Sequence, residues 1–163
     1  MATVMTPEIL HPRLLVFAKY IYLLGALLLL MFSVVITVWL FDRTPPFEMY
    51  GYTAPSTQKG GMLHVKASVR RDLSRDCSVT FSRALYDKAG RRYWESPEIY
   101  VNSDGVREIN RQMKGNLELL LEIPASAPSG QTTLVTHLKY ICNPVHRIWP
   151  IEVTAVVETV VTD

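Results

Sequence analysis

Recognisable catalytic and cofactor-binding motifs are missing from this 163-residue sequence. It contains no glycine-rich phosphate loop, no GxSxG, no HExxH and no CxxC, which are the short motifs of nucleotide, hydrolase, zinc and redox sites. Glu118 and Glu122 fall on the solvent phase of one expected strand, which is typical of a solvated face rather than of an acid–base pair. We therefore expect a non-catalytic protein with no cofactor and no bound metal.

Cysteine is scarce, and the only two are Cys77 and Cys142. Cys142 lies in the stretch LKYICNPVHRIWP, four residues before His146, so it is either a ligand or nucleophile beside that histidine or half of a structural staple. The Cys-x3-His pair, with His137 or His64 added, resembles part of a cupredoxin copper site. The resemblance is incomplete, because no methionine follows His146 and no second cysteine lies nearby.

Charge is absent from residues 20–41, YIYLLGALLLLMFSVVITVWLF. As a helix rising ~1.5 Å per residue this run spans about 33 Å, which matches the hydrocarbon core of a bilayer. Tyr20 and Tyr22 at one end, and Trp39 and Phe41 at the other, are typical of interfacial aromatic belts. The run is too long for a signal peptide, and no small-x-small cleavage site follows it. We expect an uncleaved transmembrane helix rather than a buried core helix.

The expected organisation is a short cytoplasmic tail (1–19), the transmembrane helix (20–41), a linker or stalk (42–61) and a folded domain (62–163). The linker is rich in Pro, Gly, Ser and Thr and has no persistent period. Lys and Arg are nearly balanced at the two helix ends, so the positive-inside rule decides little. The short tail and Asp42 at the far end favour a cytoplasmic N-terminus.

Residues 62–163 are dominated by alternating apolar and polar residues, the pattern of half-buried strands. Arg83 interrupts one such pattern, which suggests a bulge or a sheet edge there. Asp87-Lys88-Ala89-Gly90 predicts a hairpin loop. Strands are expected at 62–70, 77–86, 91–95, 98–101, 116–123, 132–142 and 151–161. About seven strands without a helix predict an all-β ectodomain built as an antiparallel sandwich.

The stretch Tyr140-Ile141-Cys142 lies in the penultimate expected strand, after a Pro128-Ser129-Gly130 turn. With the strand order and the domain size, it resembles an immunoglobulin-like (Ig-like) sandwich, whose tyrosine corner has Tyr two residues before a cysteine of strand F. Antibody-type domains are not matched, because Cys77 begins strand C and Trp94 lies on the return strand of a hairpin. The layout of one anchor and one domain resembles small envelope proteins of bacteria and their phages.

The Ig-like resemblance bears on the two cysteines, because strands C and F are antiparallel neighbours in such a fold. Cys77 at the start of strand C and Cys142 at the end of strand F are then expected to form a disulfide. Disulfides persist in oxidising compartments. This favours a bacterial inner-membrane protein with its N-terminus in the cytoplasm and its C-terminal domain in the periplasm.

Two groups of residues are candidate partner contacts. The loop at 143–150 lies at one end of the sandwich, where Ig-like domains often bind, although Trp149 could instead cover the core beside the disulfide. Residues 59–92 hold nine Lys and Arg against three Asp, which predicts either a basic surface for anionic lipid, cell-wall polymer or an acidic protein, or merely two solvated edges. The candidate contact residues are His146, Arg147, Trp149, Arg70, Arg71, Arg75, Arg91 and Arg92.

The function expected from these features is that of an accessory or structural subunit. The domain would hold a protein partner, or further copies of itself, at the outer face of the inner membrane, and the helix would contact the lipid bilayer. Nucleic acid is not an expected partner outside the cytoplasm. The alternatives are a phage-type holin or lysis protein with a periplasmic domain and, second, a copper-handling cupredoxin-like domain.

Overall fold

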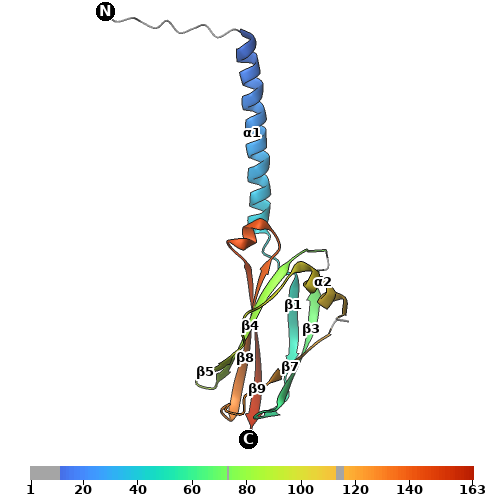
Figure 1. Ribbon diagram of the computed structural model, residues 1–163, viewed down its shortest axis with the longest axis vertical. Helices are drawn as coiled ribbons and strands as arrows, with labels where there is room; N and C mark the ends of the chain where they lie inside the picture. The colour runs from blue at the N-terminus through green and yellow to red at the C-terminus, as the bar shows by residue number, and fades with distance from the viewer. Residues whose placement is uncertain (1–11, 73, 113–115) are drawn as a thin grey trace, which may run out of the picture. The chain divides into compact units, whose positions relative to one another are not determined.

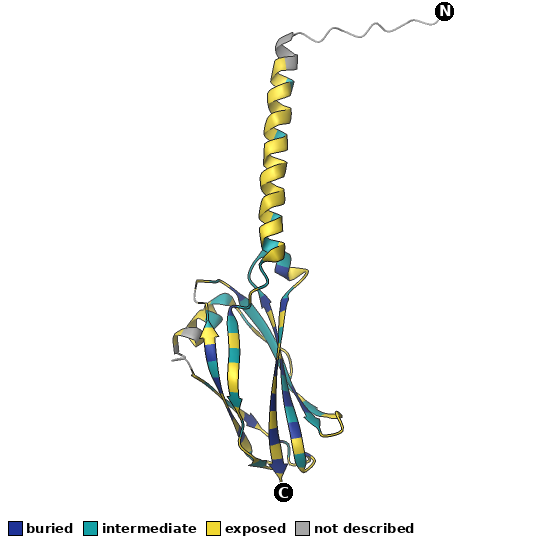
Figure 2. Ribbon diagram, turned by 180° about the vertical axis from the view of Figure 1, so that it is seen from behind, coloured by how far each residue is buried: buried dark blue, intermediate teal, exposed yellow. Residues whose placement is uncertain are grey.

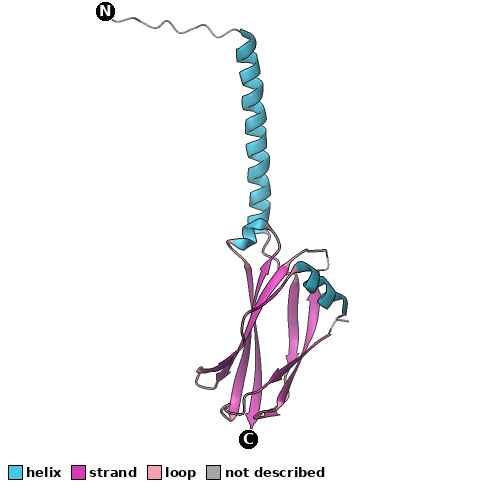
Figure 3. Ribbon diagram, in the orientation of Figure 1, coloured by secondary structure: helices cyan, strands magenta, loops and turns pink. Residues whose placement is uncertain are grey.

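The computed structural model describes residues 12–72, 74–112 and 116–163 of the chain. They form two compact units that meet in the sequence between Asp42 and Arg43. The described part of the first unit is one helix, and that of the second is mostly β-sheet with one short α-helix (Figure 1, Figure 3). A mostly β domain preceded by an apolar helix confirms the coarse prediction.

Helix α1, Pro12–Phe41, contains the whole uncharged run. None of the residues in its apolar stretch is buried (Figure 2), whereas a core helix of a soluble protein would bury one face. The helix is long and apolar enough to cross a bilayer. It begins at Pro12, so residues 12–19 are helical and not part of a separate tail, and the rest of the predicted tail, 1–11, lies outside the described residues.

One sheet has the strand order β1-β3-β7, and its strands are Phe47–Thr53, Met62–Arg71 and Asn116–Glu122. The central strand β3 pairs antiparallel with both neighbours. Its apolar residues Leu63, Val65, Ala67 and Val69 are all buried. The strict alternation read from the sequence at 62–70 is therefore confirmed.

The second sheet has the order β2-β9-β8-β4-β5, with β6 also paired to β4. Its strands are Thr57–Gln58 (β2), Ser78–Asp87 (β4), Arg92–Glu95 (β5), Ile99–Val101 (β6), Gly130–Ile141 (β8) and Ile151–Thr162 (β9). Strands β4, β8 and β9 form its antiparallel centre, and β2 runs parallel to β9. All seven predicted strands are present, with small differences at their ends.

Side chains from both sheets share one interior. Leu63 and Val65 of the first sheet pack in one cluster with Leu85 and Leu134 of the second, and all four are almost completely buried. Burying such a side chain contributes roughly 1.5–3 kcal/mol each. A second cluster lies around Tyr140, towards the opposite end of β8. The packing of two sheets around a common core is compatible with a β-sandwich.

The predicted linker at 42–61 is wrong for much of its length, because β1 and β2 lie within it. Strand β1 adds to the first sheet and β2 to the second, and the β1 residue Phe47 packs on the core. Gly51 interrupts β1 with φ of 62°, and the pairing with β3 shifts register between Tyr50 and Thr53. This irregularity hides the strand, because no continuous alternation survives in the sequence.

The expectation of no helix in the domain is also wrong, since α2 spans Ser103–Gln112. Its N-terminus is capped by Asn102, whose Oδ1 accepts a hydrogen bond from the Gly105 N–H at 2.8 Å. A Cβ at Gly105 would lie 2.7 Å from Val101 Cγ1, so the helix approaches the end of β6 too closely for a side chain. Val106 and Ile109 are its only large apolar residues, which is too short a pattern to predict a helix.

Arg83 does not mark a bulge against β8. On the other side of β4, the strand partner changes from β6 at Phe81 to β5 at Ala84, so Arg83 lies at the break between them. Strand β4 pairs with β8 without a register shift from Ser78 to Asp87, and β5 and β6 pair with β4 as well. Arg83 therefore stands on the inner face of a central strand, in phase with Phe81 and Leu85.

Candidate functional site

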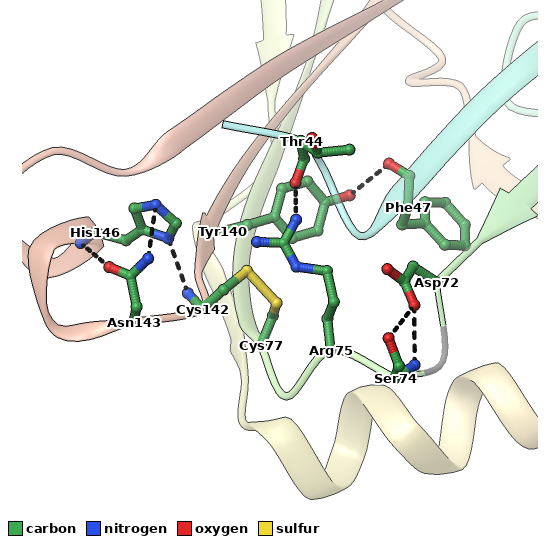
Figure 4. The surroundings of a disulfide bond; sticks show 10 residues. All are labelled: Thr44, Phe47, Asp72, Ser74, Arg75, Cys77, Tyr140, Cys142, Asn143 and His146. Atoms are coloured by element: carbon green, nitrogen blue, oxygen red, sulfur yellow. Dashed lines mark hydrogen bonds between the residues drawn. A yellow bond between two sulfur atoms is a disulfide. The ribbon is translucent and has the colours of Figure 1, made fainter. Parts of the chain in front are cut away.

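The end of the domain where β4 begins and β8 ends is held by the two cysteines (Figure 4). Ser78 pairs with Ile141, so Cys77 and Cys142 are the next opposite pair in the same register. Their sulfurs lie 2.10 Å apart, which is the distance of a disulfide bond. The bond joins neighbouring strands of one sheet, as the strand C and strand F interpretation implies.

The loop after Cys142 folds into a short 3₁₀ turn, η1, Pro144–Arg147. Asn143 caps it, because its Oδ1 accepts hydrogen bonds from the backbone N–H groups of Val145 and His146. The His146 ring is completely buried, and its Nδ1 accepts the Cys142 backbone N–H at 3.2 Å (Figure 4). The prediction that His146 contacts a partner is therefore wrong, since the ring supports the loop from within.

The tip of the same loop is exposed and held from outside by Arg43. The Arg43 guanidinium donates hydrogen bonds to the carbonyl oxygens of Trp149, at 2.7 Å, and Pro150, at 3.0 Å, and it stacks 4.1 Å above the Trp149 ring. Trp149 is 56% exposed and Ile148 is 91% exposed, so Trp149 does not cover the core. Arg147 is exposed beside them. Sequence reasoning missed Arg43, because a contact over 106 residues leaves no local signal.

The five arginines of the predicted basic surface do not lie together. Arg70 and Arg71 end β3 and Arg75 precedes β4, whereas Arg91 and Arg92 follow β4 in its hairpin with β5. A ten-residue strand separates the two groups by about 33 Å. The single basic surface is therefore wrong, and the alternative of two separate solvated edges agrees with the structure.

Tyr140 does not form the tyrosine corner that the resemblance implied. It lies at the end of β8, and its hydroxyl hydrogen-bonds the carbonyl oxygen of Phe47 in β1 at 3.4 Å, instead of the backbone just upstream in its own connection (Figure 4). Burial raises the pKa of the Tyr140 hydroxyl well above its usual value, with a smaller contribution from Tyr52. The residue ties the start of β1 to the second sheet.

Next to Tyr140, an apolar cavity of about 200 Å³ lies between the sheets. Both sheets and α2 contribute to its walls, which are predominantly apolar. The lining residues that bear on its chemistry are Phe47, Met49, Phe81, Arg83, Val106 and Ile109. The cavity could not be predicted from the sequence, because α2 was not predicted and the strand pattern alone does not show where the two sheets separate.

Arg83 is the polar side chain of greatest interest in the cavity. Its Nε is buried and has no hydrogen-bond partner, and its guanidinium lies 5.1 Å from the centroid of the Phe81 ring. Loss of solvent lowers the pKa of Arg83, because burial penalises the charged form. The only sequence signal for this site was the break that Arg83 makes in the apolar phase of its strand.

One ion pair tethers α2 beside the cavity. Arg107 of α2 lies 2.6 Å from the carboxylate of Asp76, which immediately precedes Cys77 in the sequence. Val106 and Ile109, on the neighbouring face of the same helix, line the cavity. The helix thus closes one side of the cavity, while its charged residues Asp104, Arg107, Glu108 and Arg111 are exposed.

The copper alternative requires Cys142 as a thiolate ligand, but the sulfur of Cys142 is bonded to Cys77. Within the described ranges, no three His, Cys, Asp or Glu residues are grouped so that they could hold a metal ion. No family model matches the sequence, and no curated protein is significantly similar to it. The function has to be inferred from the geometry of the chain itself.

Proposed function

We propose that this chain is a single-pass membrane protein whose C-terminal domain is a non-catalytic interaction module on the outer side of the inner membrane. Helix α1 supports the anchor, because it is long and apolar and buries no residue of its apolar stretch. The second compact unit begins in the sequence at Arg43, two residues after the helix ends at Phe41.

The strand order supports an Ig-like sandwich for this module. Such folds place strands A, B and E in one sheet and strands G, F and C in the other. The orders β1-β3-β7 and β9-β8-β4 correspond to these two sets. The disulfide departs from the antibody pattern, because it joins β4 to β8 within one sheet rather than bridging the two sheets.

The disulfide also supports the proposed orientation. A bond between two paired strands persists only where the compartment is oxidising, and the periplasm is such a compartment. A periplasmic C-terminal domain leaves the N-terminus of α1 in the cytoplasm. Fusing alkaline phosphatase to the C-terminus tests the orientation, because the enzyme is active only outside the cytoplasm, and an inactive fusion of full length would contradict it.

The observation that carries the interaction role is the exposed tip Arg147-Ile148-Trp149 on a braced loop. Ile148 and Trp149 expose neighbouring apolar side chains that a partner would remove from water, and Trp and Arg are enriched in binding hot spots. The cap by Asn143, the buried His146 and the clamp by Arg43 fix the backbone below the tip. A preformed tip loses little conformational entropy on binding.

Cross-linking and co-purification from native membranes in mild detergent test this role. The wild-type chain should bring down a stoichiometric protein with cross-links near residues 147–149, and Trp149→Ala should reduce its recovery at least tenfold, as for a hot spot of about 2 kcal/mol. Tyr50→Ala is the matched control, because Tyr50 is another aromatic residue that is 56% exposed. The accessory role fails if the wild type is recovered alone, or only as large homo-oligomers that collapse the membrane potential on expression, which is the behaviour of a holin.

A further inference from the structure

The cavity between the sheets contains a cation that no anion balances. Among the described residues, Arg83 forms no ion pair, and the acidic residue that lines the same cavity, Asp72, accepts hydrogen bonds from the backbone N–H and the hydroxyl of Ser74. The remaining charged residue of the lining, Arg75, donates to the carbonyl oxygen of Thr44 (Figure 4). The cavity lining therefore has one negative group, Asp72, against two positive groups, Arg75 and Arg83, so one positive charge is not balanced.

An arginine in this position calls for a partner. Its guanidinium stays protonated at any ordinary pH and presents five N–H donors. Arg83 is partly buried and its Nε is completely so, and withdrawing a charge from water is costly unless the charge is paired and hydrogen-bonded. The Phe81 ring offers its π face, but it accepts none of the in-plane N–H donors of the guanidinium. The fold of β4 does not require a charged residue at this inward position, because the next inward position is occupied by an apolar residue, the fully buried Leu85.

The size and lining of the cavity limit what that partner can be. About 200 Å³ lies between the roughly 150 Å³ cavity that binds benzene and the ~300 Å³ at which pockets for larger ligands begin. Apolar side chains such as Met49 and Phe47 make up most of the wall. A ligand with one slender apolar chain and one anionic end would pack against the apolar wall and pair with Arg83. A bulky ligand would not fit the volume, and a fully polar ligand would not pack against the wall.

We propose that this cavity binds a single-chain amphiphilic anion of the fatty-acid type, with its carboxylate on Arg83 and its hydrocarbon chain among Met49, Phe81 and Val106. A carboxylate matches the planar fork of a guanidinium in a bidentate pair, which is shorter and stronger than a neutral hydrogen bond. The site uses none of the residues at 147–149. Its failure would leave the partner-binding role intact, and the reverse also holds.

Octanoate is the probe, and octanol and octylamine are its matched controls with the same chain. The full-length chain, with ¹³C-labelled methionine methyl groups, is placed in phosphatidylcholine nanodiscs and titrated with each compound. The Met49 methyl signal, assigned from Met49→Leu, reports on the cavity, while Met62 in β3 and Met31 in α1 report on the rest of the domain and on loading of the bilayer. We expect a saturable Met49 shift with octanoate at about tenfold lower concentration than with octanol, and none with octylamine.

Two substitutions at Arg83 separate charge from shape. Arg83→Lys keeps the charge without the planar fork, so octanoate should bind several-fold more weakly but still better than octanol. Arg83→Met keeps the length without the charge, so the preference for octanoate should vanish. An unchanged Met62 signal in each variant shows that the domain is folded.

Three results would overturn the proposal. Octanoate and octanol could shift Met49 equally in the wild type, Arg83→Met could keep the preference for octanoate, or Met49 could respond to no amphiphile at all. In the third case, a Met49 methyl signal that shifts only when a purified protein partner is added would identify the occupant as a side chain of that partner.

Discussion

Replacing Cys77 and Cys142 together by alanine should destabilise the domain by about 4 kcal/mol, because the disulfide closes a loop with a sequence separation of 65. In the chain-entropy model the unfolded domain regains the freedom that this loop had removed. For a domain of this size each kcal/mol shifts Tm by roughly 4 °C, so the double variant should melt about 15 °C below the wild type. Removing both sulfurs avoids leaving an unpaired thiol at Cys77, which is buried.

The assay is thermal unfolding followed by far-UV circular dichroism in the β-sheet band, on the full chain in detergent micelles. Reductant provides an internal control, since it should lower the Tm of the wild type to that of the double variant and should leave the variant unchanged. Alkylation and mass spectrometry verify that reduction is complete. A fully reduced wild type that keeps its Tm within about 2 °C would refute the reasoning, because the loop closure would then contribute less than about 0.5 kcal/mol.

Three further predictions concern the core, the loop and the pH dependence. Leu85→Ala should cost about 3–4 kcal/mol in urea unfolding because the side chain is fully buried, while Leu120→Ala, at a position 54% exposed, should cost less than about 1 kcal/mol. Arg43→Ala removes two hydrogen bonds and a stacked cation from the loop at 143–150, so limited proteolysis should cut this loop several-fold faster, with other cleavage rates unchanged. Burial raises the pKa of Tyr140 above its usual value of 10.0, so its contribution is complete below pH 10 and is lost as the pH rises further, when the unfolded phenol ionises first. Tyr140→Phe should reduce this alkaline loss, measured as urea midpoints from pH 8 to pH 11, and the part that remains is expected from Tyr52 and Tyr93, whose pKa burial also raises. Little else should change, because the hydrogen bond that the substitution removes is long, at 3.4 Å.

The strands were predictable where one face is buried and the other is wet. Strand β3 and strand β9 show this alternation over their length, so period two is visible in the sequence without any knowledge of the partner strands. The link between Cys77 and Cys142 was predictable for a related reason. Cys77 lies at the start of one strand and Cys142 at the end of another, and each strand is identifiable by itself. The Ig-like resemblance predicted that these two strands are neighbours, as the pairing of β4 with β8 shows.

What could not be predicted depends on contacts between distant residues or on caps that override a local pattern. The Cys-x3-His spacing is typical of a ligand pair, but Asn143 caps the turn and His146 is buried under it. Arg43 looked like a charge beside the membrane, yet it hydrogen-bonds a loop at the other end of the domain sequence. Helix α2 has too few apolar residues to show a period, and it is stabilised by a cap and an ion pair to Asp76.

Strand β4 shows how one face can serve stability at one end and binding at the other. Its inward residues are fully buried at Leu85, but only partly buried at Phe81 and Arg83, where the sheets separate around the cavity. A leucine at position 83 would continue the core and would remove a partly buried charge that has no ion-pair partner among the described residues, a type of change that is often neutral or stabilising. The cation is thus a departure from good packing, and such departures concentrate at functional sites. The ligand is sought at Arg83 and not among the exposed arginines, because Arg83 lines a predominantly apolar cavity and its buried Nε has no hydrogen-bond partner in the described part of the chain.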